Sequence, residues 1–233
     1  MKRLCIFILF LILTLPGCSA AKGPSVENKF KQSFPDRSFE SISPTPIKGV
    51  YEVYTGNQLF YYAPDANVLI YGQIVTKDGV SLTRESYFKK MAPKMAKIPL
   101  DSAALKIGNG KNVIVEFLDP DCYHCRQSYQ FFSRRNDVTL YVFFYPLSQV
   151  SEKKIQHILC SSDRLKAYEE VMAGKVDNNA KLNICSDAKV EEILKAHKKL
   201  AGQIGIRATP FFYVKGQVIE GFDPAQFEKL LKD

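Results

Sequence analysis

Short apolar runs separated by turn residues fill the first part of this chain. Between residues 49 and 75 these runs are rich in Val, Ile and Tyr, and they predict three β-strands. The predicted strands cover residues 49–55, 58–62 and 68–75. Upstream, apolar side chains recur every four positions and predict a helix over residues 25–34, while the Ser-Pro-Thr-Pro sequence at residues 43–46 predicts a break between elements.

A longer, helical spacing of apolar residues follows over residues 82–98, and from residue 100 onward strand-like and helix-like segments alternate. The predicted strands of this second part are residues 112–118, 138–145, 211–215 and 218–221. The predicted helices are residues 122–135, 151–173, 187–202 and a last helix after Asp223-Pro224.

The sequence Cys-Tyr-His-Cys at residues 122–125 lies where the predicted strand 112–118 gives way to a helix. A C-x-x-C motif at such a corner is the dithiol arrangement of thioredoxin-like redox proteins. Free backbone N–H groups and the helix dipole favour a thiolate at Cys122, and the thiolate is the attacking species in disulfide exchange. Cys125 follows one turn later, close enough to close a disulfide. With the order of elements, the motif predicts an α+β or α/β protein, a thioredoxin-like domain with a helical insertion.

Three other interpretations of the motif were weighed. A structural zinc site needs a second close pair of Cys or His, and the remaining candidates, Cys160 and Cys185, are 25 positions apart. A haem attachment needs His directly after the second cysteine, where Arg126 stands. An inert structural disulfide is the third. We therefore expect redox chemistry, with no metal and no cofactor.

Two side chains near the motif are candidate catalytic residues. Glu116 lies in the otherwise apolar strand before Cys122, where burial would raise its pKa and let it carry a proton to or from Cys125. The alternative is that Glu116 faces water at the edge of the strand. His124 is expected to stabilise the Cys122 thiolate, which makes the disulfide a stronger oxidant; otherwise it is an exposed residue of little energetic importance.

Thr209-Pro210, directly before the predicted strand 211–215, is expected to contain a cis peptide bond opposite the dithiol. Such a turn frees the preceding backbone to pair with an extended substrate. An ordinary trans proline that opens a strand is the alternative. We assign Thr209, Pro210 and Tyr123 to the predicted substrate-binding surface.

Cys160 and Cys185 are expected to form a structural disulfide, since neither belongs to a C-x-x-C motif. A loop of this length gives about 3.5 kcal/mol of stabilisation by chain entropy. His157 and His197 lie in predicted helices and are expected at the surface rather than in a metal site.

The N-terminus has the pattern of an export signal, a basic start followed by the apolar run of residues 4–13. Residues 15–18, Leu-Pro-Gly-Cys, resemble a bacterial lipobox, so we expect removal of residues 1–17, a lipid on Cys18 and a tether over residues 18–24. Ordinary secretory cleavage near Ala20 or Ala21 remains the alternative. Either way, the expected location is the periplasm, with membrane anchoring through the lipid, where cysteines meet oxidising conditions.

Charge and size narrow the list of partners. The whole chain has 32 Lys and Arg residues and 24 Asp and Glu residues. Residues 1–17 contain two of the basic residues and no acidic residue. The expected mature chain therefore has 30 basic and 24 acidic residues, a net charge of +6. The basic residues form no block, which argues against nucleic acid as a partner. The strands and helix of residues 25–80 make a thin core with exposed aromatic strands, so we expect this region to pair with a second copy of itself. The alternative is that this sheet packs onto the second domain of its own chain. Residues 81–99 are the expected linker helix, and residues 100–233 the catalytic domain.

At this point the chain resembles the DsbC/DsbG family of periplasmic disulfide isomerases over nearly all of its mature length. Residues 42–53, Ile-Ser-Pro-Thr-Pro-Ile-Lys-Gly-Val-Tyr-Glu-Val, are similar to the dimerisation domain of that family. Residues 117–125, Phe-Leu-Asp-Pro-Asp-Cys-Tyr-His-Cys, match its F-x-D-x-x-C-x-x-C site, and Thr209-Pro210 matches its Thr–cis-Pro. The two distal cysteines correspond to its second disulfide.

The resemblance implies a small β-rich, cystatin-like dimerisation domain, a linker helix and a V-shaped homodimer. The two catalytic domains would face an apolar cleft for misfolded or otherwise disulfide-bonded exported proteins. A membrane electron donor of the DsbD type would keep the dithiol reduced.

The chain departs from the family at Tyr123-His124, where the usual dipeptide is Gly-Tyr. His124 and Glu116 are instead similar to residues of the oxidant DsbA. Three functions therefore remain open: a dimeric disulfide isomerase with reductase capacity, a dedicated oxidase or partner-specific reductase, and a metal-handling or holdase protein that uses the cleft without turnover.

Overall fold

A computed structural model describes residues 25–177 and 181–232. The expected signal peptide, Cys18 and the whole of the expected tether lie outside the described residues. The chain divides after Arg37 into two compact units, and each is described by itself. In the first, α1 (Val26–Ser33) begins where the side chain of Ser25 accepts a hydrogen bond from the N–H of Asn28, at 3.3 Å.

The second unit starts with an antiparallel sheet in the order β1-β2-β3-β4. Its strands are β1 (Ser41–Pro44), β2 (Tyr51–Tyr54), β3 (Leu59–Ala63) and β4 (Val68–Ile70). The three predicted strands are present, although β4 is shorter than predicted. The predicted break was wrong in part, because Ser43 and Pro44 end a fourth strand in which Pro44 faces Tyr51. β1 is an edge strand, with a neighbour on one side only. A proline there can lack its backbone N–H without loss of a hydrogen bond between strands.

The helix α2 (Leu82–Met95) follows and begins at Ser81, whose hydroxyl accepts from the N–H of Arg84 at 3.2 Å. Its apolar face carries Met91 and Met95, which are fully buried against the second sheet. The predicted helix over residues 82–98 is therefore present and ends three residues early. Among the described residues, no helix is both long and apolar enough to span a bilayer.

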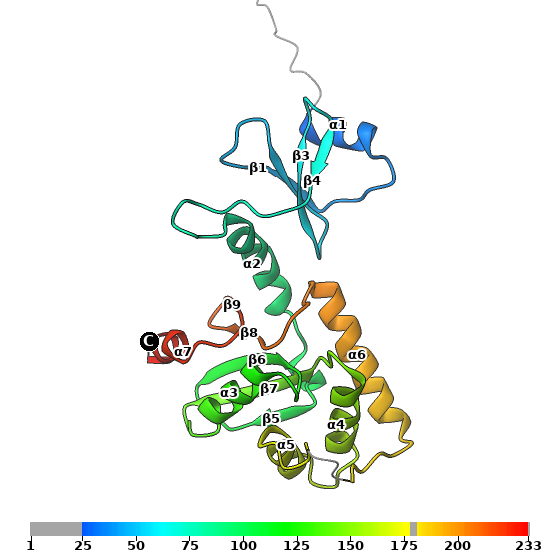
Figure 1. The fold of residues 1–233 in the computed structure, drawn as a ribbon, viewed down its shortest axis with the longest axis vertical. Coiled ribbons are helices and arrows are strands. Elements are labelled where there is room, and N and C mark those ends of the chain that lie inside the picture. Colours follow the sequence, from blue (N-terminus) through cyan, green and yellow to red (C-terminus); the bar gives the residue numbers. More distant parts are fainter. Residues whose placement is uncertain (1–24, 178–180, 233) are drawn as a thin grey trace, which may run out of the picture. The chain divides into compact units, whose positions relative to one another are not determined.

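The second sheet has five strands in the order β5-β7-β6-β8-β9 (Figure 1). Its strands are β5 (Leu105–Ile107), β6 (Asn112–Leu118), β7 (Val138–Phe144), β8 (Phe211–Val214) and β9 (Gln217–Glu220). β6 and β7 run parallel, joined by a crossover through α3 (Tyr123–Phe132), and the other neighbours are antiparallel. Four of these strands were predicted; β5, only three residues long, was not.

Helices cover both faces of this sheet. Alternate side chains of β6 point to opposite faces, so Ile114 and Leu118 join one core while Val115 and Phe117 join the other. The first core is covered by α3, α4 (Gln149–Leu159), α5 (Arg164–Met172), α7 (Pro224–Lys232) and the N-terminal half of α6 (Ala188–Ile204). The second is covered by α2 and the C-terminal half of α6. This is the thioredoxin fold with inserted helices that the sequence predicted.

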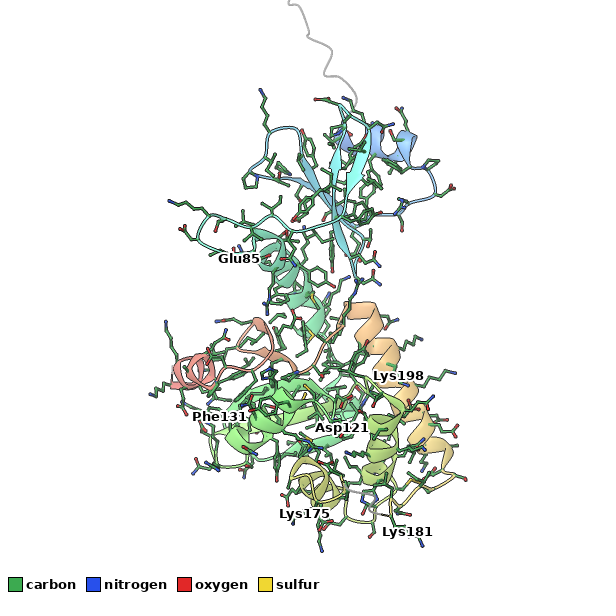
Figure 2. All side chains as sticks on the ribbon, in the orientation of Figure 1. Glu85, Asp121, Phe131, Lys175, Lys181 and Lys198 are labelled. Atoms are coloured by element: carbon green, nitrogen blue, oxygen red, sulfur yellow. A yellow bond between two sulfur atoms is a disulfide. The ribbon has the colours of Figure 1, made fainter. Side chains whose placement is uncertain are left out.

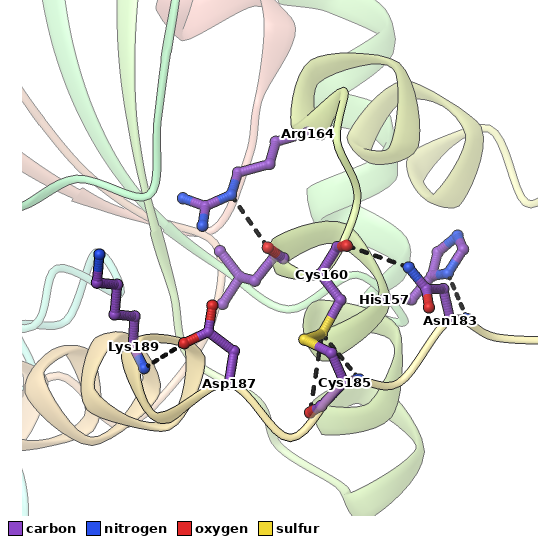
Figure 3. The surroundings of a disulfide bond; sticks show 8 residues. His157, Cys160, Arg164, Asn183, Cys185, Asp187 and Lys189 are labelled. Carbon is purple, nitrogen blue, oxygen red and sulfur yellow. Dashed lines mark hydrogen bonds between the residues drawn. A yellow bond between two sulfur atoms is a disulfide. The ribbon is translucent and has the colours of Figure 1, made fainter.

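The inserted region was predicted as one helical stretch, residues 151–173, but it forms two helices, α4 (Gln149–Leu159) and α5. The chain turns between them because Asp163 caps α5, accepting from the N–H of Lys166 at 3.0 Å. Cys160, at the end of α4, is joined to Cys185 by a disulfide with a Cα–Cα distance of 5.7 Å (Figure 3). The same figure shows His157, half-buried, whose Nδ1 accepts from the N–H of Asn183 at 2.8 Å.

The prediction that His197 lies at the surface was wrong, because its side chain is buried in the core. Its Nδ1 accepts from the backbone N–H of Phe144 at 3.0 Å, and its Nε2 lies 2.9 Å from the carbonyl oxygen of Ser102. A carbonyl can only accept, so Nε2 carries the proton. The apolar residues Val190 and Leu194 precede it at helical spacing on the same buried stripe of α6.

Removal of the Cys160–Cys185 disulfide should lower the stability of the protein. The bond closes a loop of 25 residues, and chain entropy gives a loss of about 3.5 kcal/mol for the double variant Cys160→Ala/Cys185→Ala. Urea denaturation measures the loss, and the m-value should rise because the unfolded chain without the cross-link exposes more surface. A double variant as stable as the wild type would show that the bond has no structural importance.

Candidate active site

The two cysteines of the motif lie at the start of α3, after the loop that follows β6 and beside the residue that precedes Pro210 and β8. Cys122 is the N-cap residue and is half-buried, whereas Cys125 lies in the first turn and is fully buried. Both are free thiols in this structure. The sulfur of Cys122 can therefore reach a partner protein, whereas the buried sulfur of Cys125 can reach only the sulfur of Cys122.

The environment of Cys122 favours its thiolate. Its pKa falls well below the ordinary cysteine value, to about 5, mainly through a hydrogen bond from the Cys125 thiol, with further contributions from the backbone of Cys125, from Thr209 and from the backbone of His124. Burial opposes this shift. Burial is the main reason that the pKa of Cys125 is raised far above its ordinary value. The pair is thus divided into an anionic attacking sulfur and a protonated second sulfur.

Asp119 holds the loop that carries Cys122. This carboxylate is only 2% exposed. Its Oδ1 accepts from the N–H groups of Asp121 at 2.6 Å and Cys122 at 3.2 Å and from the hydroxyl of Ser151 at 2.9 Å. Its Oδ2 accepts from the N–H of Leu147 at 2.6 Å. One buried side chain therefore fixes the turn before α3 to the start of α4.

An ion-pair network continues from this loop. Lys154 of α4, with a side chain 5% exposed, bonds Asp121 and lies 2.5 Å from Asp177. Arg126 of α3 binds both carboxylate oxygens of Asp177 and donates to the carbonyl of Pro120 at 2.8 Å. The pKa of Asp177 is lowered, first by Arg126 and then by Lys154. Asp121 and Phe131, labelled in Figure 2, stand near the two ends of α3.

Glu116 lies beneath Cys125, on the face of β6 that α3 covers. It is fully buried, and its Oε1 accepts from the hydroxyl of Ser128 at 2.6 Å. Its Oε2 has no hydrogen-bond partner among the described residues. Burial raises its pKa to about 8, with a smaller contribution from the Cys122 thiolate. Of the two positions considered from the sequence, the buried one is therefore observed.

The peptide bond between Thr209 and Pro210 is cis. The carbonyl oxygen of Thr209 lies 3.3 Å from the sulfur of Cys122, and the carbonyl of Pro210 accepts from the N–H of Gly221 at 2.9 Å. This places the backbone of residue 209 directly against the reactive sulfur. Any extended chain bound there would pass over Cys122.

The two residues between the cysteines are exposed. Tyr123 is 68% exposed, and the ring of His124 bonds the Oε1 of Gln127 through Nδ1 at 3.0 Å. The structure thus gives His124 a contact with the Cys122 thiolate through its backbone rather than its ring.

Three further side chains near these groups, Asp119, Ser128 and Tyr168, have no role predicted from the sequence. Ser128 could have been found, since it is three residues after Cys125 on the same helical face. Asp119 stood in the quoted motif without an assigned contact, and Tyr168 comes from the inserted helix α5, which no local pattern connects to the site. Within residues 25–177 and 181–232, no three side chains of His, Cys, Asp or Glu gather where they could hold a metal ion.

A thioredoxin fold with an acidic, accessible thiol at a helix N-terminus defines a thiol–disulfide oxidoreductase. The family described as "Disulfide bond isomerase protein N-terminal domain" matches residues 17–84, and the family described as "Thioredoxin-like domain" matches residues 101–233. The "Probable thiol:disulfide interchange protein DsbC" of Bordetella avium is 31% identical over 213 residues, which cover 89% of this chain and 74% of that protein. The chain belongs to the DsbC family.

A second relative matches over more of its length. The "Thiol:disulfide interchange protein DsbC" of Escherichia coli is 23% identical over 235 residues, covering 96% of this chain and 94% of that protein. Among solved structures, Proteus mirabilis ScsC in a transitional conformation has a TM-score of 0.51 at 21% identity, covering 61% of this chain and 77% of that chain. This likeness concerns the fold. As a member of the DsbC family, the protein is a periplasmic enzyme of thiol–disulfide exchange, of the disulfide isomerase type.

The lowered pKa of Cys122 predicts how the stability of the reduced protein depends on pH. A lowered folded-state pKa gives a stabilising contribution that is complete above the ordinary cysteine pKa of about 8.5. It is lost as the pH falls through about 5. The ultraviolet absorbance of the thiolate should titrate near that pH, and the same step should be absent in Cys122→Ser. A titration midpoint near 8.5 would contradict the assignment.

Proposed function

We propose that the enzyme isomerises and reduces disulfides in misfolded exported proteins, with Cys122 as the nucleophile. The observation that supports this most directly is the division of the dithiol into an accessible acidic sulfur and a buried protonated one. The Cys122 thiolate attacks one sulfur of a substrate disulfide, a mixed disulfide forms, and the other substrate sulfur leaves as a thiolate. In isomerisation, a second substrate thiolate then attacks the substrate sulfur of the mixed disulfide and frees Cys122.

In reduction, Cys125 ends the reaction. Its thiol gives a proton to the Glu116 carboxylate, and its sulfur attacks the sulfur of Cys122 and expels the substrate thiolate. A disulfide between Cys122 and Cys125 remains, and the substrate has gained two electrons. A pKa of about 8 suits Glu116 to take and return protons near neutral pH.

The other residues of the site complete the proposal. The Thr209 carbonyl and the cis Pro210 provide a backbone edge for an extended substrate, and the exposed ring of Tyr123 provides an apolar contact beside it. His124 supports the Cys122 thiolate through its backbone N–H at the start of α3. Cys160–Cys185 remains a structural bond, away from the exchange reaction.

Substitution of the second cysteine should trap substrates. Cys125→Ser removes the sulfur that releases the mixed disulfide, so adducts through Cys122 should accumulate. Cys122→Ser is the matched control and should give neither adducts nor exchange, at least 10²-fold below the wild type in refolding of a scrambled disulfide protein, as expected for loss of a nucleophile. Non-reducing electrophoresis detects the adducts. Adducts recovered through Cys125 in the Cys122→Ser protein would reverse the assignment.

Residues 25–80 are proposed as the dimerisation domain, and residues 81–99 as the linker to the catalytic domain of residues 100–233. β4 is the outer strand of its sheet and exposes the apolar side chains of Val68 and Ile70, 45% and 43% exposed. Such an edge is a template for pairing with another chain. Pairing would place two Cys122 sites on one substrate, which lets a misfolded chain stay bound through several attacks.

The soluble protein without lipid should therefore sediment as a dimer at micromolar concentration, and Val68→Lys/Ile70→Lys should convert it to a monomer. The monomer should keep disulfide reduction and lose isomerisation by roughly tenfold or more, about 1.4 kcal/mol. Val113→Lys is the matched control, since Val113 is a similarly exposed apolar residue, 46%, on β6. A wild-type monomer with full isomerase activity would refute the proposal.

Two contacts with the membrane are proposed, a lipid anchor and a membrane-bound electron donor. The Leu-Pro-Gly-Cys sequence supports a lipid anchor on Cys18, and radiolabelled palmitate should enter the wild type but not Cys18→Ala. A DsbD-type membrane protein is the proposed source of electrons, and without it the dithiol should accumulate as a disulfide. A dithiol that is mostly oxidised in wild-type cells would instead favour an oxidase, the second candidate, which the low pKa of Cys122 supports because it stabilises the reduced form.

A further inference from the structure

A buried cation stands beside the loop that carries Cys122. The side chain of Lys154, from α4, is 5% exposed, and a charge at such a place is costly unless it is paired. Lys154 bonds the carboxylate of Asp121, and its Nζ lies 2.5 Å from Oδ1 of Asp177. Burial lowers the pKa of Lys154, but the bonds to the two carboxylates outweigh burial and raise it. Lys154 is therefore held in its charged form.

Asp121 connects this cation to the reactive sulfur. It directly precedes Cys122 in the chain, and the Cα atoms of two such neighbours are about 3.8 Å apart. The backbone N–H groups of Asp121 and Cys122 both donate to Oδ1 of Asp119, at 2.6 and 3.2 Å, so the two residues share one closed turn. The charge on the Asp121 carboxylate therefore lies close to the sulfur that must itself become negative.

The charges of this group balance. Arg126, directly after Cys125, binds both carboxylate oxygens of Asp177 and lies 3.3 Å from Oδ1 of Asp121. With Lys154 there are two positive and two negative side chains in contact with one another. Without Lys154, the same group would have one uncompensated negative charge beside the dithiol.

A second ion pair of α4 has a different environment. Glu152, two residues before Lys154, lies 2.6 Å from Lys198 of α6, and the two side chains are 37% and 45% exposed. Water and salt screen such a pair, and it contributes little. Burial and the contact with the loop of Cys122 therefore distinguish Lys154 from a lysine of an ordinary surface pair.

We propose that Lys154 is a positioning residue of the active site, which holds Asp121 and cancels its negative charge so that a thiolate can form on Cys122. The proposal rests on the proposed role of Cys122 as the nucleophile. The contacts of Lys154 run to Asp121 and Asp177, so it acts through Asp121 rather than on the sulfur. Because a stabilised thiolate favours the reduced dithiol, the same contact makes the disulfide of the dithiol a stronger oxidant.

Lys154→Met tests the proposal, since it keeps the apolar stem of the side chain and removes the charge. At low ionic strength, the thiolate absorbance of the reduced variant should titrate near pH ~6 instead of about 5, because a like charge nearby raises the pKa of a thiol by about one unit or more. In equilibrium with glutathione near pH ~7, the variant should favour its disulfide roughly tenfold more than the wild type does, a reduction potential about 30 mV lower.

Asp121→Asn separates the charge of Lys154 from its packing. Combined with Lys154→Met, it removes the uncompensated carboxylate and should return the titration midpoint to about 5. Alone, it leaves an extra positive charge and should lower the midpoint below that of the wild type. Lys198→Met is the matched control, because it breaks the exposed ion pair of α4 and should titrate like the wild type. The other ionisable groups of the site are the same in every variant, Cys125, Glu116, Asp119 and His124.

Each other outcome counts against a stated part of the argument. A midpoint that stays raised in the double variant would show that Lys154 acts only through the fold and would overturn the inference. An unchanged midpoint in Lys154→Met, with no titration step in Cys122→Ser, would overturn the inference and leave the nucleophile in place. A step that persists in Cys122→Ser would overturn the proposed nucleophile as well.

A loss of folding in Lys154→Met would still leave a decisive variant. Circular dichroism identifies such a loss, and Asp121→Asn, which keeps the buried lysine, then carries the test. Its midpoint should lie below that of the wild type, and its disulfide should be reduced more readily by glutathione. A midpoint equal to or above that of the wild type would overturn the inference.

Discussion

One negative charge at the first turn of α3 is the interaction on which the site depends. The Cys122 thiolate accepts from the Cys125 thiol and from the first backbone N–H groups of the helix, and these contacts lower its pKa to about 5. Hydrogen-bond donors near Cys122 stabilise this charge, and the carboxylates near it need partners of their own. The Cys125 thiol supports it only while protonated, which explains why the second sulfur is fully buried.

Three carboxylates close to the dithiol would oppose that charge if they stood alone. Asp119 accepts from three backbone N–H groups and the Ser151 hydroxyl, and Asp121 and Asp177 are paired with Lys154 and Arg126. Lys154 and Arg126 supply two positive charges for the two carboxylates they contact. Such pairs contribute little stability at a surface, but here Lys154 is buried, and removal of one partner would leave a charge uncompensated. The two cations therefore balance the charges of Asp121 and Asp177, while Asp119 is held by hydrogen bonds.

The sequence predicted those residues of the site that can be recognised from their immediate neighbours in the chain. The C-x-x-C motif after an apolar strand, Glu116 within that strand and the Thr-Pro pair each depend on a short run of residues, and the fold followed from the order of elements. The contacts of Asp119 and Tyr168 depend on where the inserted helices dock, which no local spacing encodes. His197 was misplaced for a different reason. Its position on the apolar stripe of α6 was visible in the sequence, but a polar residue on such a stripe is buried only if partners exist, here the backbone of Phe144 and Ser102.

The inserted helices are therefore part of the active site, although they lie far from it in the sequence. α4 supplies Ser151 and Lys154, which hold the loop of Cys122, and α5 supplies Tyr168, which lies against the core that contains Cys125. The Cys160–Cys185 disulfide fixes the end of α4 to the segment before α6. The bond thus restrains α4, the helix whose Ser151 and Lys154 contact Asp119 and Asp121 in the loop before Cys122. A covalent link outside the C-x-x-C motif is in this way connected to the motif through one helix and two polar side chains.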